Sequence, residues 1–110
     1  MHELAITESI VAAVTERMRD VPISRVRIEI GALSGIVADA VRFCFGPVTA
    51  GTPLEGARLE IDEPPGRMRC RRCGREFDTT DILALCGCGS AELDVLRGRE
   101  LRIREVEVAG

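Results

Sequence analysis

The sequence predicts an α+β fold, in which a small domain of two helices and three strands carries an inserted zinc-knuckle module. Three observations predict it. Apolar residues recur at helical spacing near the N-terminus, apolar and charged residues alternate in later segments, and four cysteines form two close pairs between residues 70 and 88. We expect a discontinuous α/β domain of residues 1–66 and 99–110, and a zinc-binding domain of residues 67–98.

Two helices are predicted. The first covers residues 3–19, with an apolar stripe of Leu4, Ile10, Val11, Val14 and Met18. Pro22 excludes its continuation. The second helix is expected to begin at Asp39, whose side chain can cap it. We expect the Gly46-Pro47 pair to kink this helix or end it early.

Strands are predicted where apolar and charged residues alternate. The clearest run is 26–30, and a second covers 57–62. Apolar residues between 93 and 108 suggest a hairpin around Gly98 with a long second arm. The apolar phase slips between Ile103 and Val106, which indicates a β-bulge. The long arm has more apolar positions than a zinc knuckle needs, so it is expected to return to the sheet of the first domain.

Composition limits the classes of partner. The chain has three Phe, no Trp or Tyr, and a formal net charge of -3, which argues against a nucleic-acid partner. A local basic cluster is better explained as compensation for thiolate charge: Arg67, Arg69, Arg71, Arg72 and Arg75. No apolar run is long enough for a membrane span, and no export signal precedes the first helix, which predicts a cytoplasmic protein.

The cysteine pairs predict a zinc site. Cys70 and Cys73 form a C-x-x-C pair and Cys86 and Cys88 a shorter C-x-C pair, each followed by glycine, and Gly87 is expected to supply the turn within the second. Four thiolates fill the zinc tetrahedron, so the site is structural. A redox dithiol is an alternative, which the paired arrangement disfavours. The fifth cysteine, Cys44, is expected to be a small buried hydrophobe.

His2 is the only histidine, and a lone terminal histidine is ordinarily a bystander. Its position permits another interpretation. The α-amine of Met1, the amide nitrogen of His2 and its Nδ1 can form two adjacent chelate rings in one plane, and Glu3 can add a fourth donor. Planar nitrogen-rich coordination suits Ni(II) or Cu(II). No catalytic triad, phosphate loop or zinc-protease motif is present, so no enzymatic activity is predicted.

Several segments together resemble the HypA/HybF hydrogenase maturation family. They are Met1-His2-Glu3, residues 25–35, Arg42-Phe43-Cys44-Phe45, residues 51–57, the two cysteine pairs and residues 98–108. The resemblance implies a nickel metallochaperone that delivers Ni(II) to a maturing nickel-iron hydrogenase, with some members serving urease. It implies nickel at Met1, His2 and Glu3, and zinc at Cys70, Cys73, Cys86 and Cys88. It also implies two partners, a nickel-handling GTPase and the hydrogenase large-subunit precursor, and a monomer or homodimer.

The chain departs from the family pattern in two places. The second cysteine pair of the family is usually C-x-x-C, and an acidic residue often stands where this chain has Val37, with Asp39 as the nearest substitute. A zinc-ribbon interaction scaffold without nickel function is therefore kept as the alternative function.

Overall fold

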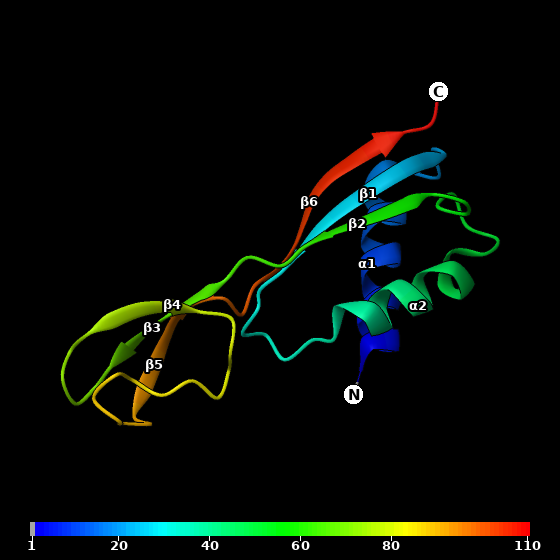
Figure 1. Cartoon of the computed structure of the whole chain (residues 1–110). Helices are drawn as coiled ribbons and strands as arrows, with labels where there is room; N and C mark the ends of the chain where they lie inside the picture. Colours follow the sequence, from blue (N-terminus) through cyan, green and yellow to red (C-terminus); the bar gives the residue numbers. More distant parts are fainter. Residues whose placement is uncertain (1) are drawn as a thin grey trace. The chain divides into compact units, whose positions relative to one another are not determined.

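The computed structural model describes residues 2–110 (Figure 1). The elements follow in the order α1 (Glu3–Met18), β1 (Ile23–Ile30), α2 (Ala38–Thr49), β2 (Arg58–Asp62), β3 (Gly66–Cys70), β4 (Glu76–Thr79), β5 (Leu93–Arg97) and β6 (Leu101–Val108). The strands form two three-stranded sheets, with the orders β2-β1-β6 and β4-β3-β5. The predicted α+β class, with two helices and a three-stranded sheet beside a separate cysteine module, is confirmed.

The described chain divides into two compact units. The first comprises residues up to Ile28, then Val37–Ile61 and Arg102–Gly110, and the second comprises Glu29–Ile36 and Asp62–Leu101. This division differs from the boundaries expected from the sequence, because residues 29–36, 62–66 and 99–101 are grouped with the cysteine module.

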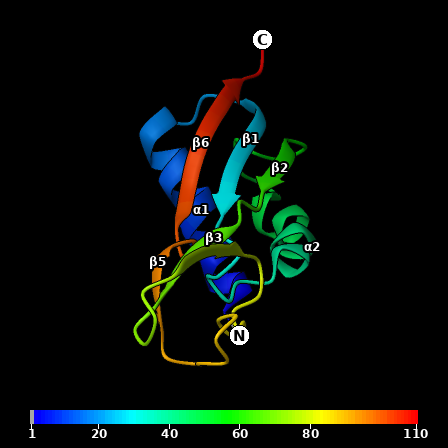
Figure 2. The same ribbon diagram turned by 60° about the vertical axis from the view of Figure 1, so that its left-hand side comes forward.

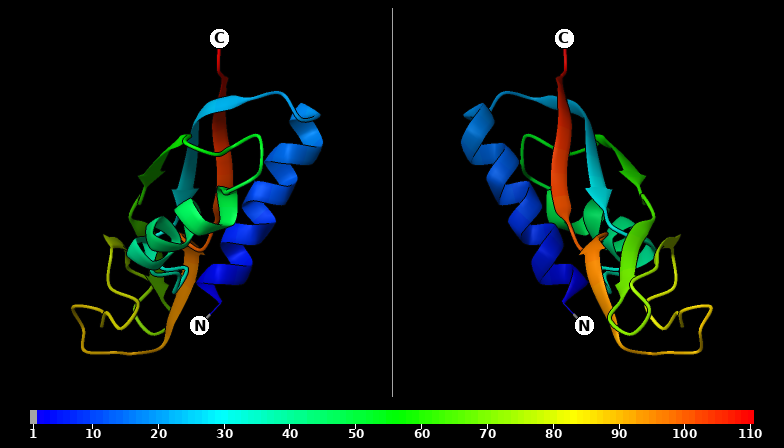
Figure 3. Two further views of the ribbon diagram at one scale, coloured as in Figure 1. Left: turned by 90° about the vertical axis from the view of Figure 1, so that its right-hand side faces the viewer. Right: turned by 90° about the vertical axis from the view of Figure 1, so that its left-hand side faces the viewer.

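The core of the first unit lies between its sheet and its two helices. Along β1, buried residues alternate with less buried ones, as the strand period requires. Val26 and Ile28 are completely buried, and α1 and α2 cover that face of the sheet (Figure 3). The opposite face is charged: Arg25 donates to Glu60 at 2.7 Å and Arg27 to Glu105 at 2.8 Å. The apolar face of β1 therefore sets the position of both helices.

Helix α2 differs from the expectation at both ends. It continues through Gly46-Pro47 to Thr49, so the predicted early end is wrong. Pro47 has no N–H to donate to the Phe43 carbonyl, and the helix continues for only two residues beyond it. The Thr49 hydroxyl donates to the Phe45 carbonyl at 2.8 Å, which adds a side-chain donor to this last turn. At the other end the N-cap position is Val37, not Asp39, and Val37 has no side-chain cap of its own.

The hairpin predicted around Gly98 is wrong, because β5 and β6 belong to different sheets. Strand β5 pairs antiparallel with β3, whereas β6 pairs with β1 in the first sheet (Figure 2). The expected return of the long arm to the first sheet is confirmed. The intervening segment is held by the loop after β1, because Leu33 N donates to Gly98 O at 2.8 Å.

Leu33 also explains why residues 29–36 join the second unit. Its side chain is 1% exposed, and a Cβ built on Gly66 would lie 2.1 Å from its Cδ1 atom. Only glycine leaves room for this contact.

No helix within residues 2–110 has the length and apolarity needed to cross a membrane.

Candidate metal sites

Four cysteine side chains converge in the second unit. Cys70 ends β3, Cys73 lies in the turn that follows, and Cys86 and Cys88 come from the loop before β5. Their Sγ atoms all lie within 4.8 Å of one another. Two of these separations join the pairs: Cys70 Sγ lies 3.8 Å from Cys88 Sγ, and Cys73 Sγ lies 3.5 Å from Cys86 Sγ. The cluster therefore draws on both knuckles.

This geometry fits a tetrahedral metal–thiolate centre. With Zn–S bonds of about 2.3 Å, the edges of a tetrahedron of sulfurs are about 3.8 Å long. The two observed separations are close to that edge. The short C-x-C spacing of Cys86 and Cys88 does not prevent either sulfur from joining the cluster.

Backbone hydrogen bonds shape each knuckle. The N–H of Cys73 lies 3.4 Å from Cys70 Sγ, and Gly89 N donates to Cys86 O at 2.8 Å. The glycines that follow the pairs have left-handed backbones, with φ of 80° at Gly74 and 91° at Gly89. Gly87 lies in the turn that the Gly89–Cys86 hydrogen bond closes, as expected, although its own φ is not positive.

The environment favours thiolate at Cys70. The hydrogen bond from the Cys73 N–H lowers the pKa of the Cys70 thiol to about 6, against the opposing effect of burial. Cationic side chains add positive charge nearby: a Cβ on Gly87 would lie 2.8 Å from Nη1 of Arg75, so the guanidinium borders the second knuckle. The low pKa means that the cluster offers a metal ligand at neutral pH.

Two of the five arginines in the basic cluster are paired with carboxylates. Arg67 donates to Asp78 at 2.8 Å, and Arg71 donates to Asp94 at 2.8 Å. These carboxylates, and not the thiolates, are the partners of the two guanidinium groups, so the pairs leave the expected compensation of thiolate charge untested. They give no support to a nucleic-acid surface.

The N-terminal candidates occupy the start of α1. Met1 lies outside the described residues. His2 is exposed at the N-cap position of α1, and Glu3 is buried in its first turn, with 8% of its surface exposed. Glu3 Oε2 accepts a 2.9 Å hydrogen bond from the N–H of Val37. The positive charge at the chain's amino terminus, followed by this hydrogen bond, lowers the pKa of Glu3 to about 2.

The contact between Glu3 and Val37 was not foreseen from the sequence. In a capping box, a Glu side chain of the same helix accepts from the N-cap N–H. Here Glu3 supplies that acceptor from another helix, 34 residues away in sequence. The only hint in the sequence is that Val37 has no side chain able to cap the helix, so an acceptor must come from elsewhere.

The remaining candidates stand apart from the cysteine cluster. The Asp39 side chain is 90% exposed and is ion-paired with Arg42 on its own helix. Cys44 is half-buried rather than fully buried, and it is not part of the cysteine cluster. Among residues 2–110, the four cysteines are the only group of three or more His, Cys, Asp or Glu side chains whose ligand atoms lie close together. A terminal chelate of backbone nitrogens and one imidazole would not form such a group.

The sequence matches the family described as "Hydrogenase/urease nickel incorporation, metallochaperone, hypA" over residues 1–108. It is 52% identical over 108 residues to the hydrogenase maturation factor HypA of Nostoc punctiforme, covering 98% of this chain and 96% of that protein. It is 44% identical over 109 residues to the HypA of Geobacter metallireducens, covering 98% and 99% respectively.

The fold agrees with solved structures. The solution structure of the Ni metallochaperone HypA from Helicobacter pylori superimposes with a TM-score of 0.65 at 21% identity, covering 98% of this chain and 97% of that one. A second solution structure of a HypA protein gives a TM-score of 0.66 at 22% identity, covering 99% and 97% respectively. These likenesses show the fold, and the family match over residues 1–108 with relatives at 44–52% identity shows that this protein belongs to the HypA family of nickel-incorporation metallochaperones, which deliver metal and do not catalyse a reaction.

Proposed function

We propose that this chain binds Ni(II) at its N-terminus and delivers it for the maturation of a nickel-iron hydrogenase. The observation that carries the proposal is the exposure of His2 at the first turn of α1, directly beside a carboxylate that is ionised and held in place by Val37. An exposed imidazole at the second residue is the arrangement that a terminal chelate needs. Family membership supplies the delivery role.

The proposed donors are the α-amine of Met1, the amide nitrogen and Nδ1 of His2, and Glu3. Successive donors along the chain close small chelate rings, and planar nitrogen coordination suits Ni(II). Because Glu3 Oε2 already accepts from the Val37 N–H, a nickel ion bound through that oxygen would have to share or displace this hydrogen bond. Nickel binding is therefore expected to change the hydrogen bonding of the Val37 N–H at the start of α2.

We propose zinc as the metal of the four cysteines, with Cys70, Cys73, Cys86 and Cys88 as its ligands. The sulfur separations and the lowered pKa of Cys70 support a thiolate-bound divalent ion. Four protein ligands leave no open position, so the ion would stabilise the knuckles rather than activate water. Nickel, which the chain is proposed to deliver, would bind separately at Met1, His2 and Glu3.

The proposed partners are a nickel-handling GTPase and the hydrogenase large-subunit precursor, in the cytoplasm. All five cysteines are free thiols in the structure, which suits a reducing compartment. Titration calorimetry with a cognate nickel GTPase, with and without nickel and nucleotide, should detect association. Absence of heat under all of these conditions would exclude this route of delivery.

The nickel site is tested by equilibrium dialysis of untagged protein with Ni(II). Binding should fall sharply in His2→Ala and in a chain extended by a few residues before Met1, since the extension removes the free α-amine. Asp39→Asn is the matched control, because Asp39 is exposed and paired with Arg42, and it should bind like the wild type. Undiminished nickel binding in both test variants would exclude the N-terminal site. A wild-type chain that binds zinc but no nickel would favour the zinc-ribbon scaffold.

A further inference from the structure

The four clustered thiols differ in their access to solvent. Cys73 and Cys88 are exposed. Cys70 and Cys86 are buried, with 1% and 3% of their surfaces accessible. Each knuckle therefore has one thiol that a dissolved oxidant can reach and one that is shielded. Because cysteine oxidation follows exposure as well as thiolate character, Cys73 and Cys88 are the sites where an oxidant acts first.

Each exposed thiol has a buried thiol of the other knuckle beside it. Cys73 Sγ lies 3.5 Å from Cys86 Sγ. Cys88 Sγ lies 3.8 Å from Cys70 Sγ. A disulfide bond is about 2.05 Å long, so the sulfurs of the closer pair need to approach each other by only about 1.5 Å. An accessible cysteine next to a second cysteine that can resolve its oxidised form is the usual arrangement of a redox-sensitive thiol.

The surroundings of Cys73 are cationic. Arg72 precedes it and Arg75 follows two residues later, and both side chains are exposed. A Cβ on Gly87 would lie 2.8 Å from Nη1 of Arg75, so the same guanidinium also borders the second knuckle. Reactive cysteines are found in electropositive, partly exposed surroundings of this kind, because positive charge stabilises the thiolate that reacts. The cluster therefore combines access, a resolving partner and favourable charge.

Disulfides between the knuckles suit the fold better than disulfides within them. Cys73 and Cys86 are 13 residues apart in sequence, and Cys70 and Cys88 are 18 apart, whereas the members of one knuckle are only three or two positions apart. A crosslink that closes a longer loop restricts the unfolded chain more. Both bonds between the knuckles would also join the end of β3 to the loop that leads into β5, the strand that pairs with β3. They would therefore crosslink the same segments that the metal holds together.

The reaction with a peroxide balances without a further reagent. The Cys73 thiolate attacks hydrogen peroxide: an S–O bond forms, the O–O bond breaks and hydroxide leaves, which gives a sulfenic acid. The Cys86 thiolate then attacks that sulfur, so that the S–S bond forms, the S–O bond breaks and a second hydroxide leaves. Two thiolates lose two electrons, and one peroxide is reduced to two hydroxides, which take two protons from solvent to become water. Cys88 and Cys70 react in the same way with a second peroxide.

We propose that the four cysteines form a peroxide-responsive switch, in which disulfides of Cys73 with Cys86 and of Cys70 with Cys88 replace zinc while the second unit stays folded. The inference rests on the zinc site proposed above. The first disulfide removes two of the four ligands of zinc, so the ion is released when that bond forms. The second unit then has two folded states, one zinc-bound and one oxidised, and it unfolds only when it is both reduced and metal-free.

Zinc release from the untagged, reduced chain tests the switch. Elemental analysis before oxidation should give one zinc per chain, and a reduced chain without zinc would refute the zinc site itself. Hydrogen peroxide should then release the zinc to a colorimetric chelator, with about one peroxide consumed for each zinc released. Cys44→Ser is the matched control, because Cys44 lies outside the cluster, and it should release zinc at the wild-type rate. Dithiothreitol with added zinc should restore the starting state.

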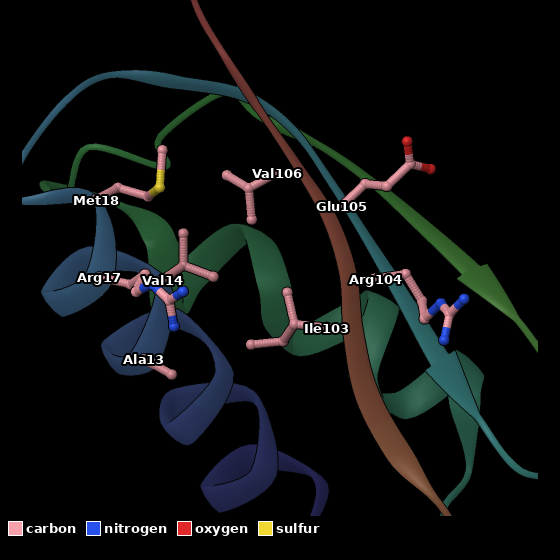
Figure 4. A pocket seen from close by; sticks show the side chains of 8 residues that line it. All are labelled: Ala13, Val14, Arg17, Met18, Ile103, Arg104, Glu105 and Val106. Atoms are coloured by element: carbon pink, nitrogen blue, oxygen red, sulfur yellow. The ribbon is translucent and has the colours of Figure 1, made fainter.

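Peptide mass spectrometry, after free thiols have been blocked, identifies the bonds that form. The oxidised chain should contain Cys73 bonded to Cys86 and Cys70 bonded to Cys88. Oxidation of methionine has to be distinguished from these bonds. Met18 lines a groove of about 350 Å³ between α1 and β6 (Figure 4), and peroxide can convert its thioether to a sulfoxide. A sulfoxide gains an oxygen atom whereas a disulfide loses two hydrogens, so the peptide masses separate the two reactions.

Hydrogen exchange of the same samples shows whether the fold survives. The amides of β3 and β5 should stay protected in the oxidised, metal-free chain and should lose protection in the reduced chain after zinc is chelated. Zinc that stays bound in excess peroxide, in a chain shown to contain it, would overturn the switch and leave the zinc site standing. Disulfides within the knuckles, a disulfide to Cys44, or loss of protection once oxidation has released the zinc would also overturn it.

Discussion

The Glu3 carboxylate accepts a 2.9 Å hydrogen bond from the backbone N–H of Val37, and this bond joins the first turn of α1 to the N-cap of α2. Val37 cannot cap its own helix, and an ionised carboxylate near a helix N-terminus is favoured by the helix dipole. Glu3 therefore stabilises the packing of the two helices, whatever further part it has in binding nickel.

Replacing Glu3 with Gln should make the free energy of unfolding of the first unit depend less on pH in the acid range. The folded state lowers the pKa of Glu3 from 4.5 to about 2, so its charge stabilises the fold above pH 4.5. That contribution is lost as the pH falls through about 2. Urea unfolding followed by helical circular dichroism should show Glu3→Gln less stable than the wild type at neutral pH, with the difference shrinking in acid.

Glu8→Gln is the control for the Glu3 variant, because it removes a charge from an exposed position on the same helix. It should unfold like the wild type at neutral pH. A Glu3→Gln variant that matched the wild type at neutral pH would show that the bond to Val37 contributes nothing measurable.

Replacing Cys73 with Ala should remove zinc and the fold of the second unit together. Zinc binding and folding of such a module are one free-energy event, because its ligands are organised only when the metal is bound. Elemental analysis should fall from one zinc per chain to nearly none, and the amides of β3 and β5 should lose exchange protection. Cys44→Ala, which alters a cysteine outside the cluster, should keep full zinc content. Full zinc in Cys73→Ala would require a different set of ligands.

A methyl group at position 66 should destabilise the second unit. A Cβ there would lie 2.1 Å from Leu33 Cδ1 and 2.7 Å from the Arg97 carbonyl oxygen, and the backbone atom cannot rotate away. We expect Gly66→Ala to cost about 1–3 kcal/mol in urea unfolding, as overpacked sites usually do. Gly110→Ala is the control: nothing beyond its chain neighbour lies within 4 Å of the added Cβ, and this variant should unfold like the wild type. Equal stability of Gly66→Ala and the wild type would contradict the contact with Leu33.

The sequence by itself determined the features that depend on local spacing. The alternation along β1, the helical stripe of α1 and the two cysteine pairs each report a geometry that extends over only a few residues, so they could be recognised without a structure.

The tertiary structure alone decided which distant segments meet. Leu33 and Gly98 separate β5 from β6, which local pattern had joined in a hairpin, because residues 65 apart in sequence share a hydrogen bond. The cap of α2 comes from Glu3 for the same reason: the Val37 N–H donates to an acceptor that only tertiary packing brings near it. Sequence periodicity predicts whether a segment forms a helix or a strand. Which other element that segment packs against depends on how the whole chain buries its apolar residues.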